Sequence, residues 1–195
     1  LIDCFGHQIR IAIVEQGQLV EVLLENKEEK SIVGNIYAGK VVSVVEGMQA
    51  AFVDIGQEKN AYYYYGNQRA KTDTFERKSK KPKTGDTVTV QVQKDAVGQK
   101  GAVVTDKIAL IGKFVILLLT ESGQINVSQK IENGDEKKRI KHCMEQILPK
   151  EYGVIVRTQG EHKTQEVFEQ EIKYLLKQAE KIKNTKDFLK PPALL

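Results

Sequence analysis

The chain has 195 residues, of which 41% are hydrophobic and 29% charged, and its formal net charge is +4. This composition excludes an intrinsically disordered chain, because it supplies enough apolar surface for a sizeable core. It also excludes a helical membrane span, since no apolar run approaches the roughly 20 residues that a span requires.

The N-terminal residues and the cysteines bear on localisation. The opening, LIDCFGHQIRIAIVE, has no basic leader followed by a long apolar segment, so it lacks the pattern of a secretory signal. Cys4 and Cys143 lie far apart, and the three histidines are scattered, which argues against a zinc site. We therefore expect a cytoplasmic protein with two reduced thiols and no metal site in these residues.

The first half of the chain is strand-rich. The runs RIAIVE and LVEVLLE, separated by Gln16-Gly17-Gln18, predict a β-hairpin. From Asn35 to about Asp106 come further strand-like pieces, namely NIYAGKVVSVV, QAAFVDIG, AYYYY, TVTVQVQKDAV and GAVVTDK. About five short strands with glycine-rich turns favour a small β-barrel over a helical bundle.

Aromatic side chains on this barrel are candidates for binding single-stranded nucleic acid. Phe52 and Tyr62 lie on consecutive predicted strands, where a period of two lets them project from the same face. Bases stack on such side chains for roughly 1–3 kcal/mol each. The alternative for each of these side chains is that it packs in the core as an ordinary aromatic. In the run of tyrosines at 62–65, alternate residues must face opposite sides of the sheet, so some pack inward while others are exposed. The predicted cationic rim of the stacking platform comprises Lys40, Lys59 and Lys100.

Two further features of the barrel leave alternatives open. Residues 66–84 contain seven Lys or Arg and two acids, a local charge of +5, which would attract a polyanion or mark a solvated loop. Gly98 and Gly101 frame a Gly-x-x-Gly sequence, which suits either a hairpin turn or a phosphate-binding loop.

After Asp106 the pattern changes to mixed strands and helices. IALIGKFVILLL predicts a short element, a break at Gly112 and a buried strand, and QINVSQ and YGVIVR predict two more strands. Asn133 or Asp135 can cap a helix that ends near Leu148, and Thr164 can cap a longer helix. The apolar stripe of that longer helix is either core or an interface with a partner, and it comprises Val167, Phe168, Ile172, Leu175, Leu176, Ala179 and Ile182.

Arg157 and Thr158 end a predicted strand, where a guanidinium and a hydroxyl can bind a terminal phosphate. Spacing alone gives this pair little weight. The sequence shows no converging carboxylates and no nucleophile with a neighbouring base, so we predict no catalytic residue.

Taken together, these segments resemble a known family. GNIYAGKVVSVVEGMQAAFVDIGQEKNAYYY is similar to the barrel of the ribonuclease E/G endoribonucleases, and VQVQKDAVGQKGAVVT, IALIGKFVILLL and YGVIVRTQG continue the likeness in family order. The resemblance implies an α+β fold, with a small antiparallel OB-type β-barrel followed by an α/β 5′-sensor subdomain. The implied domains are half of a split RNase-H-like subdomain (1–34), the OB barrel (35–106), the sensor (107–185) and a tail leading to a missing portion (186–195).

The resemblance also implies a function, which is RNA binding and 5′-monophosphate sensing within a single-strand-specific endoribonuclease of RNA processing and decay. The family's stacking aromatics fall on Phe52 and Tyr62, and a family lysine falls on Lys100. The residues implied to hold the 5′-monophosphate are Arg157, Thr158, Gly112 and Ile116. In the family's Ser-Arg-Arg-Ile stretch this chain instead has Ser128-Gln129-Lys130-Ile131, which puts tight binding of the RNA backbone there in doubt.

In the family the aspartates that hold Mg²⁺ belong to a domain that would lie beyond Leu195. We therefore expect this piece to have no cofactor of its own and to be inactive alone. A homo-oligomer of the full-length protein is compatible with the resemblance. The main alternative is a stand-alone, non-catalytic OB-fold RNA-binding protein. A third interpretation is an assembly role, in which the apolar helix stripe docks a partner.

Overall fold

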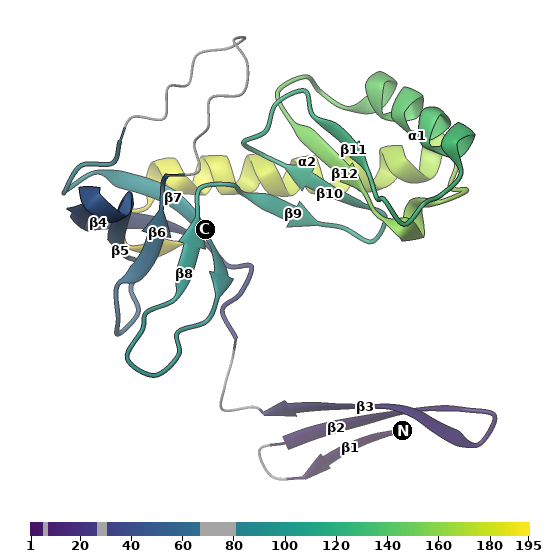
Figure 1. The fold of residues 1–195 in the computed structure, drawn as a ribbon, viewed down its shortest axis with the longest axis horizontal. Coiled ribbons are helices and arrows are strands. Elements are labelled where there is room, and N and C mark those ends of the chain that lie inside the picture. Colours follow the sequence, from purple (N-terminus) through teal and green to yellow (C-terminus); the bar gives the residue numbers. More distant parts are fainter. Residues whose placement is uncertain (6–7, 27–30, 67–80) are drawn as a thin grey trace. The chain divides into compact units, whose positions relative to one another are not determined.

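The computed structural model describes residues 1–5, 8–26, 31–66 and 81–195 (Figure 1). The chain divides into two compact units, Leu1–Ile32 and Val33–Leu195. Most of the basic segment predicted at 66–84 lies outside the described residues, so its role in attracting a polyanion stays a prediction.

The first unit is a three-stranded antiparallel sheet of β1 (Ile2–Phe5), β2 (Gln8–Glu15) and β3 (Gln18–Asn26). Strands β2 and β3 form the predicted hairpin, whose turn residues Gln16 and Gly17 both have positive φ angles of 49° and 79°. Most of the large apolar side chains of the hairpin are exposed, with Leu19 and Leu24 each more than half accessible to solvent. Such an apolar surface is typical of an interaction face.

The second unit begins with a closed barrel of β4 (Ile36–Val45), β5 (Ala50–Asp54), β6 (Ala61–Tyr64), β7 (Thr87–Lys94) and β8 (Val103–Thr105). The strand order is β4-β5-β6-β8-β7, and β7 pairs back with β4. This Greek-key order is that of a five-stranded OB-type barrel, as predicted. The predicted OB-type barrel has antiparallel neighbours except at one pair, where β8 lies parallel to β6.

Side-chain alternation explains how the barrel strands form. In TVTVQVQK of β7, Val90 and Val92 point into the core while Thr87 and Gln93 of the alternate set are exposed. In β5 and β6 the inward residues are likewise small or aromatic, and they comprise Ala51, Val53, Ala61 and Tyr63. The opposite set of side chains on these two strands is left on the outer face.

A second sheet follows, formed by β9 (Ala109–Ile111), β10 (Val115–Leu118), β11 (Ile125–Val127) and β12 (Gly153–Val156). Its order is β11-β12-β10-β9, in which β11 and β12 are parallel and the other neighbours antiparallel. The carboxyl ends of β11 and β12 therefore meet at the same edge of the sheet. This edge places the residues that follow each strand beside one another.

Two helices, α1 (Gly134–Ile147) and α2 (Gln165–Phe188), share a core with this sheet. Asn133 caps α1 as predicted, because its side chain accepts the N–H groups of Asp135 and Glu136 at 2.9 and 3.2 Å. Thr164 occupies the N-cap position of α2 without a side-chain capping bond. The most deeply buried part of the α2 stripe packs inside the unit rather than against a partner, and it comprises Phe168, Ile172, Leu175 and Ala179.

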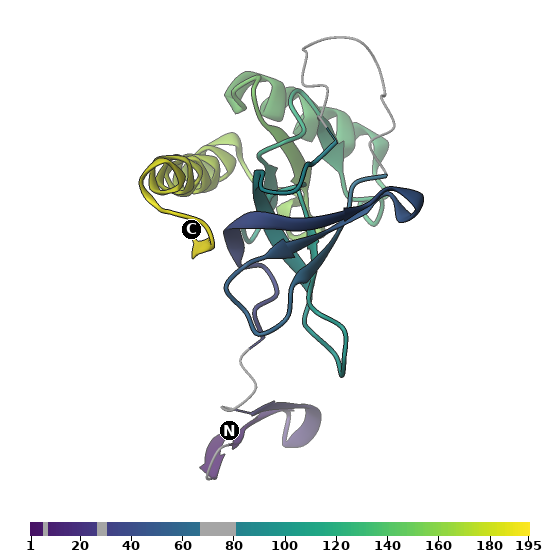
Figure 2. The same ribbon diagram turned by 90° about the vertical axis from the view of Figure 1, so that its left-hand side faces the viewer.

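The barrel and the second sheet are joined by specific contacts. The Gln91 side chain accepts the N–H of Ala109 and donates to its carbonyl, both at 2.9 Å. After α2, residues 193–194 form β13 (Ala193–Leu194), which pairs antiparallel with Tyr37 and Ala38 of β4. The sequence predicted only a tail over 186–195, whereas the helix runs to Phe188 and the end of the chain adds a strand to the barrel sheet. Figure 2 shows this C-terminal segment beside the barrel.

Within the described ranges, no helix is both long enough and apolar enough to cross a membrane.

Candidate nucleic-acid interface

The outer face of β5 and β6 carries the predicted aromatic pair. Phe52 and Tyr62 are register partners on the two strands, and their ring centroids lie 6.1 Å apart at an interplanar angle of 71°. This edge-to-face contact stabilises both rings while each stays partly accessible to solvent. The two side chains therefore project from one face, as the period of two predicted.

The tyrosine run alternates as expected. Tyr63 and Tyr65 are buried, with ring centroids 6.4 Å apart, whereas Tyr64 is 42% exposed. Because Tyr62 and Tyr64 are two residues apart in β6, they share the outer face. Tyr64 is thus a third aromatic on the face that carries Phe52, and the sequence did not single it out.

The three predicted rim lysines differ in their surroundings. Lys40 is exposed on β4, opposite Asp54 of β5. Lys100 is exposed at the end of a hairpin turn whose backbone pairs Val97 with Lys100. The Lys59 ammonium donates a hydrogen bond to the Gly98 carbonyl and so links two turns. Lys59 is therefore less available to a ligand than Lys40 and Lys100.

The Gly-x-x-Gly stretch has a structural explanation. Gly98 has a φ angle of 56°, in the left-handed region that favours glycine in hairpin turns. A side chain at Gly101 would collide with the backbone carbonyl of Asn60, so the close approach of these segments requires glycine there. These two constraints account for both glycines without a bound phosphate.

Three of the four predicted phosphate-binding residues, Arg157, Thr158 and Gly112, lie near the carboxyl ends of β11 and β12. Arg157 follows β12, and its Nη1 donates to the Gly112 carbonyl at 2.7 Å. The Thr158 hydroxyl lies 3.2 Å from the hydroxyl of Ser128, the residue that follows β11. Ile116 lies in β10, where it pairs with Ile155. The structure thus brings together Arg157, Thr158 and Gly112, and adds Ser128 to them.

A carboxylate that the sequence analysis missed organises the loop around Gly112. Glu171 of α2 accepts the backbone N–H groups of Lys113, Phe114 and Val115, the last two at 2.9 Å. A Cβ atom at Gly112 would lie 2.8 Å from the carboxyl carbon, which explains the glycine. Glu171 is three residues after the buried Phe168, so its position on the buried stripe was a signal that could have identified it.

Replacing Glu171 by alanine is expected to destabilise the chain by roughly 2–3 kcal/mol, since three N–H groups lose a charged acceptor. Urea denaturation followed by circular dichroism measures this change in the free energy of unfolding. Glu169→Ala, at an exposed position of the same helix, is the control and should change it by less than about 0.5 kcal/mol. Equal effects of the two substitutions would contradict an anchoring role for Glu171.

Two lysines contact the ring of Phe114, close to the predicted phosphate-binding residues. The ammonium groups of Lys113 and Lys163 lie 5.3 and 5.4 Å from the centre of the Phe114 ring. The backbone carbonyl of Phe114 accepts the N–H of Arg157 at 2.8 Å. The basic cluster is therefore contiguous with Arg157 in the backbone hydrogen-bond network.

A buried ion pair anchors the loop that carries Lys163. Glu136 is only 8% exposed and accepts Arg139 at 2.7 and 2.8 Å and the backbone N–H of His162 at 2.8 Å. Arg139 also donates to the Lys163 carbonyl at 2.9 Å. The hydrogen bond from Arg139, reinforced by that from His162 and opposed by burial, lowers the pKa of Glu136 from 4.5 to about 2.

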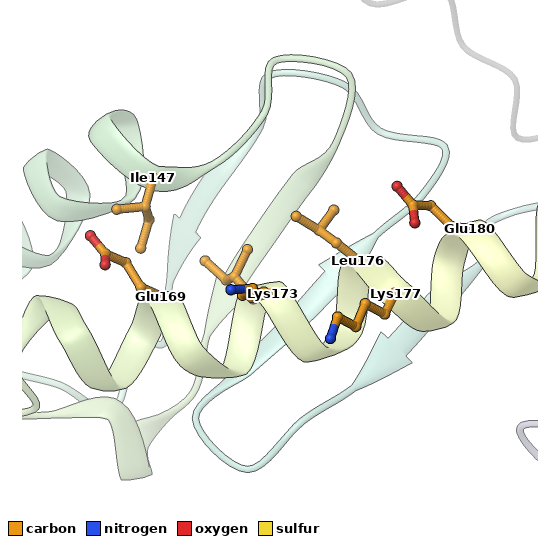
Figure 3. A pocket seen from close by; sticks show the side chains of 7 residues that line it. Ile147, Glu169, Lys173, Leu176, Lys177 and Glu180 are labelled. Carbon is orange, nitrogen blue, oxygen red and sulfur yellow. The ribbon is translucent and has the colours of Figure 1, made fainter.

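Other candidate sites are weaker. A cavity of about 360 Å³ on α1 and α2 is lined by three apolar side chains, those of Ile147, Ile172 and Leu176. Figure 3 shows Ile147 and Leu176 among the lining residues. The charged side chains at its rim are spread along the helix, and Figure 3 shows no convergence of them. The residues that the structure describes contain no group of three or more His, Cys, Asp or Glu side chains placed to hold a metal ion.

The fold and the site define a class of protein, an α+β protein with an OB-type barrel that carries exposed aromatics and a separate basic edge. Comparison with known proteins gives the family. Residues 109–195 match the model of the ribonuclease E/G family. Ribonuclease G of Haemophilus influenzae is 37% identical over 185 residues, a match that covers 90% of this chain and 38% of that protein.

Two proteins of Escherichia coli K12 give similar results. Its ribonuclease G is 34% identical over 171 residues, which covers 83% of this chain and 35% of the relative. Its ribonuclease E is 30% identical over 200 residues, which covers 96% of this chain and 18% of the relative. The chain is therefore similar to proteins of the ribonuclease E/G family over most of its length, and it spans well under half the length of these three relatives.

Proposed function

We propose that this chain is the RNA-binding and 5′-monophosphate-sensing part of a single-strand-specific endoribonuclease of RNA processing and decay. The observation that carries the proposal is the assembly of Arg157, Thr158 and Ser128 at one sheet edge. It lies in the same compact unit as the exposed aromatic face of the barrel. The matched relatives are named ribonucleases, which supports RNA as the ligand.

In this proposal a single RNA strand lies on the outer face of β5 and β6, with bases stacked on Phe52 and Tyr62. Its 5′-monophosphate binds at Arg157, whose guanidinium has five N–H donors, of which the bond to Gly112 uses one. The remaining donors can form a bidentate contact with phosphate oxygens, and Thr158 can donate its hydroxyl proton. A 5′-hydroxyl end offers no charge to either group.

The cleavage chemistry is proposed to reside in parts of the longer protein outside this sequence, where Mg²⁺ would be held. The matched relatives are all much longer than this chain, and the described residues hold no cluster suited to a metal ion. We therefore derive no cleavage step from these residues and propose that the chain alone binds RNA without cutting it. The exposed apolar face of the first unit is proposed to pack on another part of a split RNase-H-like subdomain.

The sensing proposal predicts a large effect of Arg157→Ala. Two single-stranded RNAs of identical sequence, one with a 5′-monophosphate and one with a 5′-hydroxyl, are titrated by fluorescence anisotropy. We expect the wild-type chain to bind the monophosphate RNA at least about tenfold more tightly, and Arg157→Ala to abolish that preference, because a charge-assisted bidentate contact is lost.

Arg157→Lys is the control for charge, since lysine keeps the cation but loses the planar fork, and it should restore only part of the preference. If the wild type binds both RNAs equally, the sensing function is wrong and the barrel alone accounts for RNA binding. That outcome would favour a non-catalytic OB-fold RNA-binding protein. A nuclease assay on the same chain tests whether it is inactive alone.

A further inference from the structure

We infer that Lys113, Phe114 and Lys163 form a second phosphate subsite, which binds an internucleotide phosphodiester next to the 5′-terminal phosphate. This inference rests on the proposed function and extends it from one phosphate to two. It concerns residues that the resemblance did not assign and that come from segments about fifty positions apart in the sequence.

The first observation is that two ammonium groups share one aromatic ring. Their distances of 5.3 and 5.4 Å from the ring centre keep them within about one Debye length of each other at 0.1 M salt. Like charges this close repel each other, and an anion placed between or beside them removes that repulsion. Neither lysine belongs to an ion pair found among the described residues, so their charges remain available to a ligand.

The second observation is that the carboxylate of Glu171, which contacts the loop of Lys113, already has hydrogen-bond donors. Glu171 accepts three backbone N–H groups from the loop that carries Lys113 and Phe114. Its negative charge is therefore compensated by amide dipoles and opposes an incoming phosphate less than a free carboxylate would. Lys113, Lys163 and Arg157 supply three positive charges to this part of the chain.

The third observation is that the backbone positions both lysines relative to Arg157. Lys113 directly follows Gly112, whose carbonyl accepts the Arg157 guanidinium, and Phe114 accepts the Arg157 N–H. Lys163 is held through its carbonyl by Arg139, which is itself paired with the buried Glu136. A phosphate bound by the two lysines would therefore lie beside the one held by Arg157 and Thr158.

The residue types suit an internal phosphodiester. Such a group carries one negative charge, and a lysine ammonium binds it as a point charge without the bidentate geometry that favours arginine at a terminal phosphate. The Phe114 ring adds a flat apolar surface for the neighbouring sugar or base. Because this subsite lies next to the terminal phosphate, an RNA uses it only when its 5′ end is docked.

The test replaces both lysines by methionine, which keeps an unbranched stem against the Phe114 ring and removes the charge. The 195-residue chain is titrated with a 5′-monophosphorylated RNA of about ten nucleotides, at salt from about 50 to about 300 mM. We expect Lys113→Met/Lys163→Met to weaken binding about fivefold and to reduce the slope of log K against log salt by about 0.7 per lost phosphate contact. Affinity for the matched 5′-hydroxyl RNA should change less than about twofold.

The matched control is Lys150→Met/Lys181→Met, which removes the same charge from exposed positions before β12 and near the end of α2. If the control weakens the monophosphate RNA as much as the test variant, net charge explains the effect and the subsite is overturned. If Arg157→Ala abolishes the 5′ preference but the lysine variant leaves it intact, this inference fails while the proposed function stands. If the wild type has no 5′ preference, both fail.

Discussion

Replacing Phe52 and Tyr62 together by alanine is expected to lower the affinity of the chain for single-stranded RNA by about 100-fold at moderate salt. Each base that loses its stacking partner costs roughly 1–3 kcal/mol, so a loss of about 1.4 kcal/mol at each of the two rings gives an effect of this size. The two rings contact each other on the outer face of β5 and β6. The double substitution therefore removes both stacking surfaces of this face. Fluorescence anisotropy with a labelled RNA measures the change.

Two controls separate stacking from folding. Phe52→Tyr combined with Tyr62→Phe keeps both ring faces and should bind with nearly the affinity of the wild type. Tyr174→Ala removes an aromatic that is 61% exposed on α2 and should leave RNA binding unchanged. Wild-type affinity in the double alanine variant, with an unchanged melting temperature, would refute the stacking face.

Glu136→Ala is expected to give the largest loss of stability among single substitutions near the phosphate-binding residues, roughly 2–4 kcal/mol. Glu136 is nearly fully buried, and its removal leaves the Arg139 guanidinium and the His162 N–H without their acceptor. Breaking a buried ion pair costs roughly 3–5 kcal/mol, and the partial exposure of Arg139 reduces that figure. Urea denaturation at neutral pH measures the loss, with the exposed Asp135→Ala as the control.

The same carboxyl group makes stability depend on acid pH. The pKa of Glu136 is lowered from 4.5 to about 2, so the unfolded state binds this proton more readily than the folded state does. The stabilisation is fully present above about pH 4.5 and is lost as the pH falls toward 2. We expect Glu136→Gln, which does not titrate, to be less stable at neutral pH and to lose less stability across this window. Parallel pH profiles for Glu136→Gln and the wild type would contradict this assignment.

Much of the fold follows from local patterns. The alternation in TVTVQVQK, the turn at Gln16 and Gly17 and the cap at Asn133 each predicted an element that the structure contains. The family resemblance then predicted which residues would form the phosphate site. Arg157 and Gly112 do meet, although spacing alone gave Arg157 and Thr158 little weight.

The features missed by the sequence analysis depend on contacts between distant segments. Strand β13 forms only because the end of the chain returns to β4, and Glu171 acts as an anchor only because α2 passes the loop after Gly112. The basic cluster on Phe114 likewise joins a lysine before β10 to one before α2. No local propensity encodes these pairings.

The sequence by itself therefore determined most of the strands, the two helices, the turn and cap residues and the resemblance to the family, because backbone conformation and side-chain periodicity depend on near neighbours. Only the tertiary structure decided which tyrosines are buried and which are exposed, which lysine is hydrogen-bonded to a turn and which carboxylates are buried. Those properties depend on packing between segments that are far apart in the chain. Burial and hydrogen bonding at such contacts set the charge and accessibility of each side chain, and hence what it can bind.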